Sequence, residues 1–446
     1  MIPSGRLVTF YGDDFSGSTD VMEVLAANGL ETVLFLDVPE ERQLERFPNC
    51  RAIGIAGCSR SQSPAWMTTN LPRIFQALQQ LQAPLCHYKI CSTFDSSRQV
   101  GSIGRALEIG QEIFGSPYVP LVVGAPALRR YCVFGNLFAT VAGDTHRLDR
   151  HPTMFRHPVT PMAESDLRLH LAAQTSKRIG LLDILALESE EPSERLERLL
   201  SQGFEVILFD VLDEASLQQV GSLLWNSRSQ PQSFLVGSSG VEYALTAWWR
   251  SSGLLPPTVE FPSAGETDRI VVVSGSGSPV TEGQIRWAMA RGGFGSIAID
   301  VLRLLEHESA AAESARVLNL ALAELEAGRS VILHTALGPS DTRLLGAARR
   351  SAPELQEKLG FCLGELLRET LLHSTVRRAV ICGGDTSARA GSQLGIFAVT
   401  TLKPLAPGSP LCRAWSADPR FDGLEIVFKG GQVGGENFFG LVLRGG

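Results

Sequence analysis

One pattern constrains the fold more than any other feature of the chain. Short apolar runs recur, each followed by a loop rich in Gly, Ser and Asp and then by a helical segment. Buried parallel strands need such near-continuous apolar runs, and a helix usually crosses over to the next strand. In the helical stretch 18–28, Val21, Val24 and Leu25 share one face. The pattern predicts an α/β fold with mostly parallel sheets flanked by helices, doubly wound in the first half of the chain.

The apolar runs locate the expected strands. In the first half of the chain they lie at 7–11, 32–36, 52–56, 85–90, 119–123, 179–184, 206–209 and 234–236. In the second half they lie at 270–273, 295–300, 330–334 and 379–382. From residue 400 onward, short runs between Gly and Pro are more typical of antiparallel strands. The Pro-punctuated segment 144–170 is expected to form a long loop or lobe over the first domain.

The length and one interruption of the pattern predict two domains. At roughly 150 residues per domain, 446 residues allow two large domains. The polar, Pro-containing stretch 251–268 breaks the rhythm before the next strand begins. We therefore expect a first domain at 1–255, a linker at 256–268 and a second domain at 269–446.

The charge balance argues against polyanionic partners. Forty basic side chains against 47 acidic ones give a net charge of −7, so there is no global basic field to attract nucleic acid or an anionic membrane. No run approaches the roughly 18 apolar residues of a membrane span, and a secretory signal is lacking. Eight cysteines without a C-x-x-C pair read as buried thiols. We expect a cytoplasmic protein with a small-molecule partner, and the sequence leaves a homodimer open.

The loop after the first strand carries the most polar chemistry in the first domain. Asp13 and Asp14 stand beside small hydroxyls such as Ser16, at the start of a helix. One such residue would suffice to cap the helix. Two adjacent carboxylates could orient a polyol, act as a general base or approach a metal. We favour a functional role for this loop.

Two further loops of the first domain lie at the same predicted sheet edge, because ligands bind at the carboxyl ends of strands in such folds. Arg60 follows the third strand and could hold a carboxylate in a two-pronged pair. Lys89 ends the fourth strand, and Ser92 and Asp95 follow it among other hydroxyls. Together the loops suggest a pocket for a small, hydroxyl-rich anion.

The second domain has three glycine loops. Residues 274–281, which include Ser276, lie between a strand and a helix, an arrangement suited to phosphate. Val280 stands where a dinucleotide fingerprint needs its third glycine, and no lysine follows a glycine as in a P-loop. The other loops span 383–387 and 429–434. Asp385 could reach Mg²⁺ directly or through water. Three such loops favour phosphoryl transfer, although glycine in tight turns would explain each one alone.

Four histidines, His146, His151, His157 and His170, fall in the predicted lobe. Their spacings match no helical metal-ligand motif. Loop structure is the better interpretation, and we assign no residue as a metal ligand.

At this point the sequence resembles the four-carbon acid sugar kinases, which comprise threonate, erythronate and 3-oxo-tetronate kinases. The resemblance spans nearly the whole chain through GDDFSGSTD, YKICSTFDSS, RHPVTPM, SGSGSPVT, GGDTS, PLAPGSP and KGGQVGGENFF. It implies a substrate-binding N-terminal domain and a nucleotide-binding C-terminal domain, with the active site in the cleft between them. STFDS is most similar to the 3-oxo-tetronate branch, whereas Gly101-Ser102-Ile103-Gly104 and the long loop at 147–162 depart from it. A branched relative such as 3-oxo-isoapionate is therefore a competing substrate.

The resemblance also implies roles for individual residues. ATP would bind Ser276, Gly383, Gly384, Asp385, Thr386 and Gly431. The sugar acid would be recognised by Asp13, Asp14, Arg60, Lys89, Ser92 and Asp95, and we add Ser16 as a candidate.

The resulting hypothesis is an ATP- and Mg²⁺-dependent kinase that phosphorylates the terminal hydroxyl of a small sugar acid. Either Asp13 or Asp14 would be the base, while Arg60 and Lys89 would hold the carboxylate. Two alternatives stay open: a nicotinamide-dependent dehydrogenase of a hydroxy acid, and a non-catalytic sugar-acid sensor.

Overall fold

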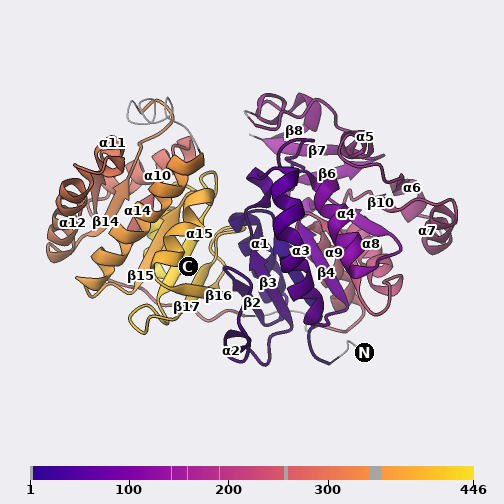
Figure 1. Ribbon diagram of the computed structural model, residues 1–446, viewed down its shortest axis with the longest axis horizontal. Coiled ribbons are helices and arrows are strands. Elements are labelled where there is room, and N and C mark those ends of the chain that lie inside the picture. The colour runs from indigo at the N-terminus through magenta and orange to yellow at the C-terminus, as the bar shows by residue number, and fades with distance from the viewer. Residues whose placement is uncertain (1–3, 142, 158, 190, 256–259, 342–352) are drawn as a thin grey trace. The chain divides into compact units, whose positions relative to one another are not determined.

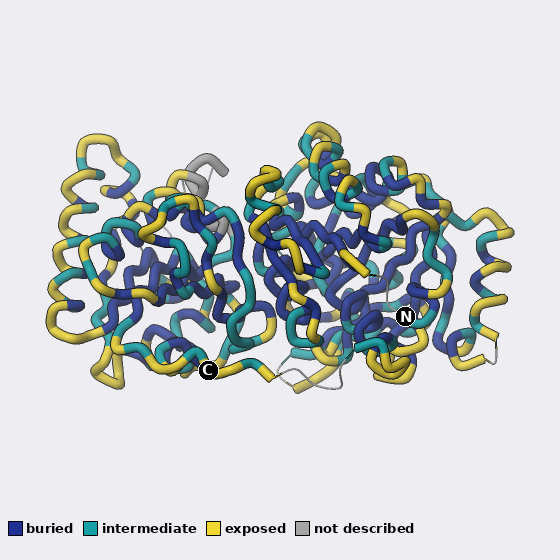
Figure 2. Tube along the Cα trace, turned by 90° about the horizontal axis from the view of Figure 1, so that it is seen from below, coloured by how far each residue is buried: buried dark blue, intermediate teal, exposed yellow. Residues whose placement is uncertain are grey.

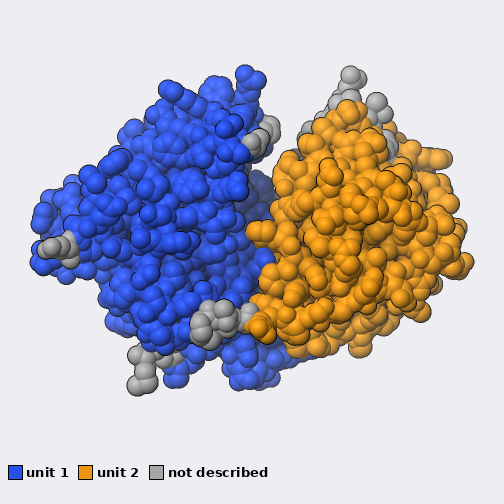
Figure 3. All heavy atoms as spheres, turned by 180° about the vertical axis from the view of Figure 1, so that it is seen from behind, with its two compact units in different colours: residues 1–32, 40–259 blue, residues 33–39, 260–446 orange. Residues whose placement is uncertain are grey.

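The computed structural model describes residues 4–141, 143–157, 159–189, 191–255, 260–341 and 353–446. The chain divides into two compact units, coloured separately in Figure 3. Unit 1 consists of residues 1–32 and 40–259, and unit 2 consists of residues 33–39 and 260–446. Each unit contains a mostly parallel sheet with helices, which confirms the predicted α/β class.

The sheet of unit 1 is entirely parallel, in the order β3-β1-β4-β11-β5-β10-β9. Its strands are β1 (Val8–Gly12), β3 (Ala52–Ala56), β4 (Leu85–Lys89), β5 (Val119–Val122), β9 (Ile179–Leu182), β10 (Val206–Phe209) and β11 (Ser233–Gly237). Its helices are α1 (Phe15–Ala27), α2 (Glu41–Leu44), α3 (Pro64–Gln80), α4 (Ile103–Phe114), α5 (Leu167–Ala172), α6 (Ile184–Leu187), α7 (Pro192–Ser201), α8 (Glu214–Asn226) and α9 (Gly240–Ser251).

Burial explains why these apolar runs form strands. Every residue of β1, β3, β4, β5, β10 and β11 is buried, as expected for parallel strands covered on both faces. Helices α3 and α4 pack against each other, and so do α8 and α9, while α1 contacts α9. Figure 2 shows the buried residues gathered in the interior of each unit. The carboxyl ends of adjacent strands therefore form one edge, at which the following loops meet.

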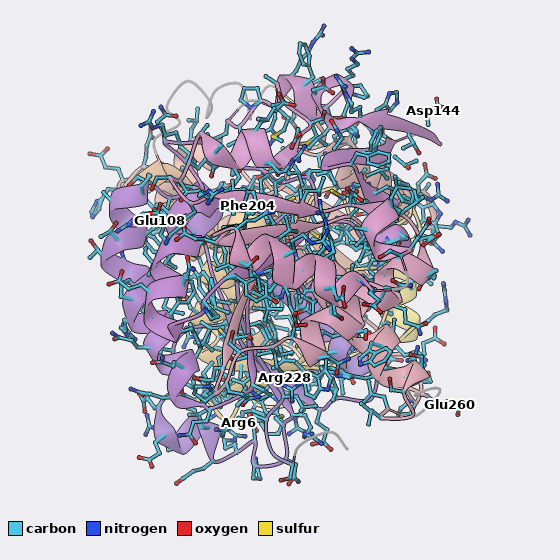
Figure 4. All side chains as sticks on the ribbon, turned by 90° about the vertical axis from the view of Figure 1, so that its right-hand side faces the viewer. Arg6, Glu108, Asp144, Phe204, Arg228 and Glu260 are labelled. Atoms are coloured by element: carbon cyan, nitrogen blue, oxygen red, sulfur yellow. The ribbon has the colours of Figure 1, made fainter. Side chains whose placement is uncertain are left out.

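Unit 1 also carries a small antiparallel sheet that the strand pattern does not predict. It consists of β6 (Arg130–Val133), β7 (Asn136–Val141) and β8 (Asp144–Arg147), and we call residues 125–170 the lobe. Phe134 and Gly135 join β6 to β7 with φ angles of 50° and 78°, as a tight hairpin requires. Figure 1 shows the three strands with α5 at one end of the unit, and Figure 4 shows Asp144 at its periphery. The expected loop at 144–170 thus contains a strand and short 3-10 turns.

Unit 2 has the strand order β13-β14-β12-β15-β18-β17-β16, with β2 next to β16. Its strands are β12 (Val271–Ser274), β13 (Phe294–Ala298), β14 (Ser330–His334), β15 (Arg378–Cys382), β16 (Ile396–Lys403), β17 (Leu411–Ser416) and β18 (Glu425–Lys429). Its helices are α10 (Pro279–Ala290), α11 (Val301–Leu305), α12 (Ala310–Glu326), α14 (Pro353–Leu372), α15 (Gly384–Gln393) and α16 (Phe438–Arg444). Strands β13, β14, β12, β15 and β18 pair in parallel. Strand β17 is antiparallel to both β18 and β16.

Strand β2 (Thr32–Phe35) differs from the sequence-based expectation. It was expected as a parallel strand of the first domain. In the structure it runs antiparallel to β16, with Leu34 opposite Val399 and Phe35 opposite Ala398, and residues 33–39 group with unit 2. An apolar four-residue run fits either sheet, so its pattern alone carries no information about which partner it takes.

Candidate active site

The loop after β1 uses its two carboxylates differently. Asp14 is the N-cap of α1, where Oδ1 accepts a hydrogen bond from the Gly17 amide at 2.8 Å. Ser18 Oγ donates to the Asp14 carbonyl, which closes the first turn. Ser16 lies in the same turn and is partly exposed. The helix therefore needs only Asp14 as a cap, and the Asp13 side chain is left for another contact.

That contact is Arg60, which lies in the 3-10 turn after β3. Because β1 and β3 are neighbours, their carboxyl ends bring Asp13 and Arg60 together. Arg60 Nε donates to Asp13 Oδ2 at 3.1 Å and Nη2 donates to Asp13 Oδ1 at 2.6 Å. Nη2 also donates to Asp14 Oδ1 at 2.7 Å. One guanidinium thus bridges both carboxylates.

The exposure of the three side chains separates their roles. Asp13 is only 3% exposed, whereas Asp14 and Arg60 are each 25% exposed. Burial raises the pKa of Asp13, and the charge and hydrogen bonds of Arg60 oppose that shift. Burial alone would lower the pKa of Arg60, but Asp13 and Asp14 outweigh it and raise that pKa well above its ordinary value. Arg60 is therefore a permanent cation beside a buried acid.

Lys89 completes this cluster from β4, the other neighbour of β1. It is buried, and its Nζ lies 3.9 Å from Oδ2 of Asp20 on α1. A side chain at position 17 would place its Cβ 2.6 Å from Asp14 Oδ1 and 2.8 Å from Lys89 Nζ. Glycine at 17 therefore permits the approach of Asp14 and Lys89. Sequence reasoning overlooked Asp20, although the residue stands within the first motif.

The loop after β4 lies beside this cluster. Thr93 Oγ1 donates to Asp95 Oδ1 at 2.7 Å and lies 2.9 Å from Cys91 Sγ. Burial and the charge of Asp95 raise the pKa of Cys91 to about 11, while Arg60 opposes the shift. The charges of Asp95 and of Arg60, which lie on different loops, therefore both act on the Cys91 thiol. Ser92 is partly exposed next to it. The seven candidates of the first domain therefore gather at one edge of the sheet.

In unit 2 the three glycine loops follow adjacent strands, β12, β15 and β18. The Gly275 amide donates to the Cys382 carbonyl, and the Gly383 amide donates to the Lys429 carbonyl. Gly383 has a φ of 127°, which favours glycine, and α15 starts at Gly384. The side chains of Asp385 and Thr386 lie outside the described residues.

Ser276 and Gly431 lie together although they are distant in sequence. A Cβ at position 431 would lie 2.7 Å from Ser276 Oγ. Thr281 Oγ1, on α10, donates to the Gly431 carbonyl at 2.9 Å and lies 3.2 Å from Ser276 Oγ. Lys429 is buried, and its Nζ donates to the Gly430 carbonyl at 2.8 Å. Thr281 thus joins two of the loops, a role that the sequence analysis did not assign.

Gln284, one turn further along α10, secures the last glycine loop. Its Nε2 lies within 3.1 Å of the carbonyl oxygens of Val433, Gly434 and Gly435. Its side chain is fully buried. A polar side chain three residues after Thr281 on a helix face is the sequence signal that could have identified it.

These contacts fit a phosphate chain. The N-termini of α10 and α15 lie at the ends of neighbouring strands, and such termini favour anions. Gly383 and Gly431 keep the loops free of side chains. The described residues hold no group of three His, Cys, Asp or Glu side chains that could bind a metal. Asp385, the candidate for Mg²⁺, is not among the described side chains.

Three of the lobe histidines, His151, His157 and His170, make side-chain hydrogen bonds to protein groups. His170 Nε2 lies 3.1 Å from Ser96 Oγ, and His157 Nδ1 accepts from the Thr160 amide at 3.0 Å. The rings of His146 and His151 stack edge to face at 5.9 Å.

In the part of the chain that the structure describes, no helix is long and apolar enough to cross a bilayer.

Two family models match consecutive parts of the chain. A sugar-binding N-terminal domain matches residues 8–245, and a nucleotide-binding C-terminal domain matches residues 271–439. The 3-oxo-isoapionate kinase of Paraburkholderia graminis is 49% identical over 99% of this chain and 95% of its own length. The 3-oxo-tetronate kinase of Cupriavidus necator is 31% identical over 97% of this chain and 95% of its own length.

A solved structure shows the same fold. A protein of Salmonella typhimurium LT2, provisionally described as a tRNA synthase, superposes with a TM-score of 0.79 at 26% identity and covers 98% of both chains. That provisional description is not carried over, because the relatives that share more of the sequence are named kinases. The resemblance indicated by the motifs is confirmed, and the chain belongs to the four-carbon acid sugar kinase family.

Proposed function

We propose that this protein is an ATP-dependent kinase that phosphorylates a hydroxyl of a small 3-oxo sugar acid, with 3-oxo-isoapionate as the leading substrate. The observation that carries the proposal is the 49% identity with a 3-oxo-isoapionate kinase over 99% of the chain. The cluster of Asp13, Asp14, Arg60 and Lys89 supports it, because two acids and two cations suit a hydroxylated anion. The comparisons lend no support to a dehydrogenase or a sensor.

Within this function we assign Asp14 as the group that orients the attacking hydroxyl and accepts its proton. Its Oδ1 is engaged by Gly17 and Arg60, whereas no described residue donates a hydrogen bond to its Oδ2. A quarter of the Asp14 side chain is exposed, so a substrate can reach it. Both oxygens of Asp13 are bound by Arg60, so Asp13 fixes the guanidinium. A modest base suffices, since the transition state of phosphoryl transfer is loose.

The nucleotide would be held by the three glycine loops of unit 2. Ser276, Gly383, Gly384, Asp385, Thr386 and Gly431 are the proposed residues. When bound, ATP with Mg²⁺ supplies the phosphoryl group, and Asp385 is the proposed contact to the metal. The loops themselves bind phosphate oxygens through backbone amides, and Thr281 and Gln284 keep the loops in place.

The test is ADP release with ATP and Mg²⁺ against a panel of acids. The panel contains 3-oxo-isoapionate, both enantiomers of threonate and erythronate, and their 3-oxo forms, with the phosphorylated position read by NMR. We expect 3-oxo-isoapionate to give the highest kcat/KM. Oxidation of an acid with a nicotinamide would support the dehydrogenase, and binding of an acid without ADP release would support the sensor. We retain a homodimer and a cytoplasmic location as expectations, to be tested by light scattering and by fractionation.

A further inference from the structure

Arg130 stands at the start of the lobe, next to the candidate active site. Its amide and carbonyl both pair with Ala125, three residues after the end of β5. In the sheet, β11 separates β5 from β4, with Gly237 opposite both Val122 and Lys89. Arg130 thus follows a strand whose carboxyl end lies at the same edge as the end of β4.

The guanidinium of Arg130 is only half engaged. Nη1 donates to the carbonyls of Leu128 at 3.1 Å and Arg129 at 3.2 Å, and lies 3.5 Å from that of Thr140. Nε is buried and has no hydrogen-bond partner among the described residues. The Nε–Nη2 edge, which matches a carboxylate, therefore has no acceptor in the described part of the chain. An unsatisfied buried donor costs free energy that a bound anion would recover.

Arg60 offers a direct contrast. Its own Nε–Nη2 edge is filled by Asp13, through bonds of 3.1 and 2.6 Å. The two-pronged pair that was expected between Arg60 and a substrate carboxylate is therefore already made within the protein. On Arg130 the Nε of the same edge is buried and has no acceptor among the described residues.

Groups of the loop after β4 and of the lobe lie around Arg130. Burial lowers the pKa of Arg130, and Cys91 and Asp95 oppose that shift, which places all three near one another. Burial, Arg130 and His146 lower the pKa of His151. His151 Nδ1 accepts from the amides of Thr153 and Met154, each at 3.3 Å, so these bonds assign the proton to Nε2. Nε2 is a second donor beside an arginine that stays charged at neutral pH.

We propose that Arg130 binds the carboxylate of the sugar acid through its Nε–Nη2 edge, with His151 Nε2 as a neighbouring donor to the substrate. This inference rests on the proposed function, since it assigns the carboxylate of that same substrate. It makes the lobe a recognition element, while Asp14 and Lys89 act at the hydroxyl end. If Arg130 were purely structural, its Nη1 hydrogen bonds would be its whole role. That role would not explain why a buried Nε is left without an acceptor.

The test compares Arg130→Gln and Arg130→Lys with a matched control, Arg129→Gln, which removes the same charge from the exposed neighbour. KM and kcat are measured for the sugar acid, for its neutral carboxamide and for ATP. Arg130→Gln removes the ion pair between the guanidinium and the substrate carboxylate. Because that pair is desolvated, we expect the KM of the acid to rise by about 30-fold or more. The KM of ATP and the KM of the carboxamide should stay within about twofold, since neither uses the carboxylate. Arg130→Lys should be intermediate, because it keeps the charge but lacks the two-pronged edge.

Binding is measured separately, from the shift in melting temperature that the acid causes in each variant. An unchanged acid KM in a folded Arg130→Gln, or an equal loss in Arg129→Gln, would overturn the inference while leaving the kinase intact. Conversely, a wild type that binds the acid without turnover, together with an Arg130→Gln that does not bind it, would overturn the proposed function and keep the role of Arg130. If Arg130→Gln does not fold, the same comparison is read from Arg130→Lys.

Discussion

Arg60 and Asp13 are joined by two hydrogen bonds, of 2.6 and 3.1 Å, across the carboxyl ends of β3 and β1. The acid is nearly inaccessible, whereas the arginine reaches solvent with a quarter of its surface. Removing the cation would leave a buried carboxylate without its partner, which costs more than removing both groups.

Arg60→Met should therefore lower the free energy of unfolding by about 2 kcal/mol, less than for a fully buried pair because Arg60 is partly exposed. Urea unfolding measures the loss. The double variant Arg60→Met with Asp13→Asn is the control and should lose less than Arg60→Met alone. Equal losses in both would mean that the pair is not coupled.

The two carboxylates should separate in activity. Asp14→Asn keeps the capping oxygen but removes the acceptor at Oδ2, so kcat should fall about 100-fold or more with the KM of ATP unchanged. Asp13→Asn should act mainly on stability, because both its oxygens face Arg60. Steady-state kinetics and urea unfolding of both variants decide the matter. Near-full turnover in Asp14→Asn with an inactive, folded Asp13→Asn would reverse the assignment.

The sequence predicts the parallel strands well, because β3, β10 and β14 have the bounds of their apolar runs. It does not predict that β2 pairs with β16, since an apolar run specifies burial and not a partner. Strands β6 to β8 escape notice because they are partly exposed, and β6 and β8 also contain charged residues.

The candidate site shows the same division. Motifs identify the loops that carry Asp13, Arg60 and Lys89, because strand ends are read directly from the sequence. The pairing of Arg60 with Asp13 depends on β1 lying beside β3, which is a property of strand order. The Nε of Arg130 lacks an acceptor because the carbonyls near the guanidinium bind Nη1 instead, and only side-chain geometry reveals that.

Gly383 should control nucleotide binding. Its φ of 127° is strained for any L side chain, and its amide binds the Lys429 carbonyl. Gly383→Ala should raise the KM of ATP about tenfold or more, since about 1.4 kcal/mol of strain or displacement gives that factor. The KM of the acid should not change. Gly293→Ala is the matched control, because a Cβ there meets nothing within 4 Å. An increase of the ATP KM in both variants would contradict a specific role for Gly383.

Lys429 should make stability depend on alkaline pH. Burial lowers its pKa below the ordinary 10.5, with Cys382 opposing, and no described carboxylate forms an ion pair with it. The native state therefore releases this proton at a lower pH than the unfolded chain does. Between the two pKa values the unfolded state holds more protons, so the free energy of unfolding rises with pH up to about 10.5 and then levels off.

Urea unfolding at several pH values below and up to 10.5 measures this slope. Lys429→Met removes the titrating group but keeps an apolar stem of similar length, so its curve should be flatter than that of the wild type. The substitution also removes the hydrogen bonds from Lys429 to Gly430 and Thr281. Their loss shifts the free energy of unfolding equally at every pH, so it does not change the slope. Parallel curves for the two proteins would show that Lys429 does not titrate differently in the native and unfolded states.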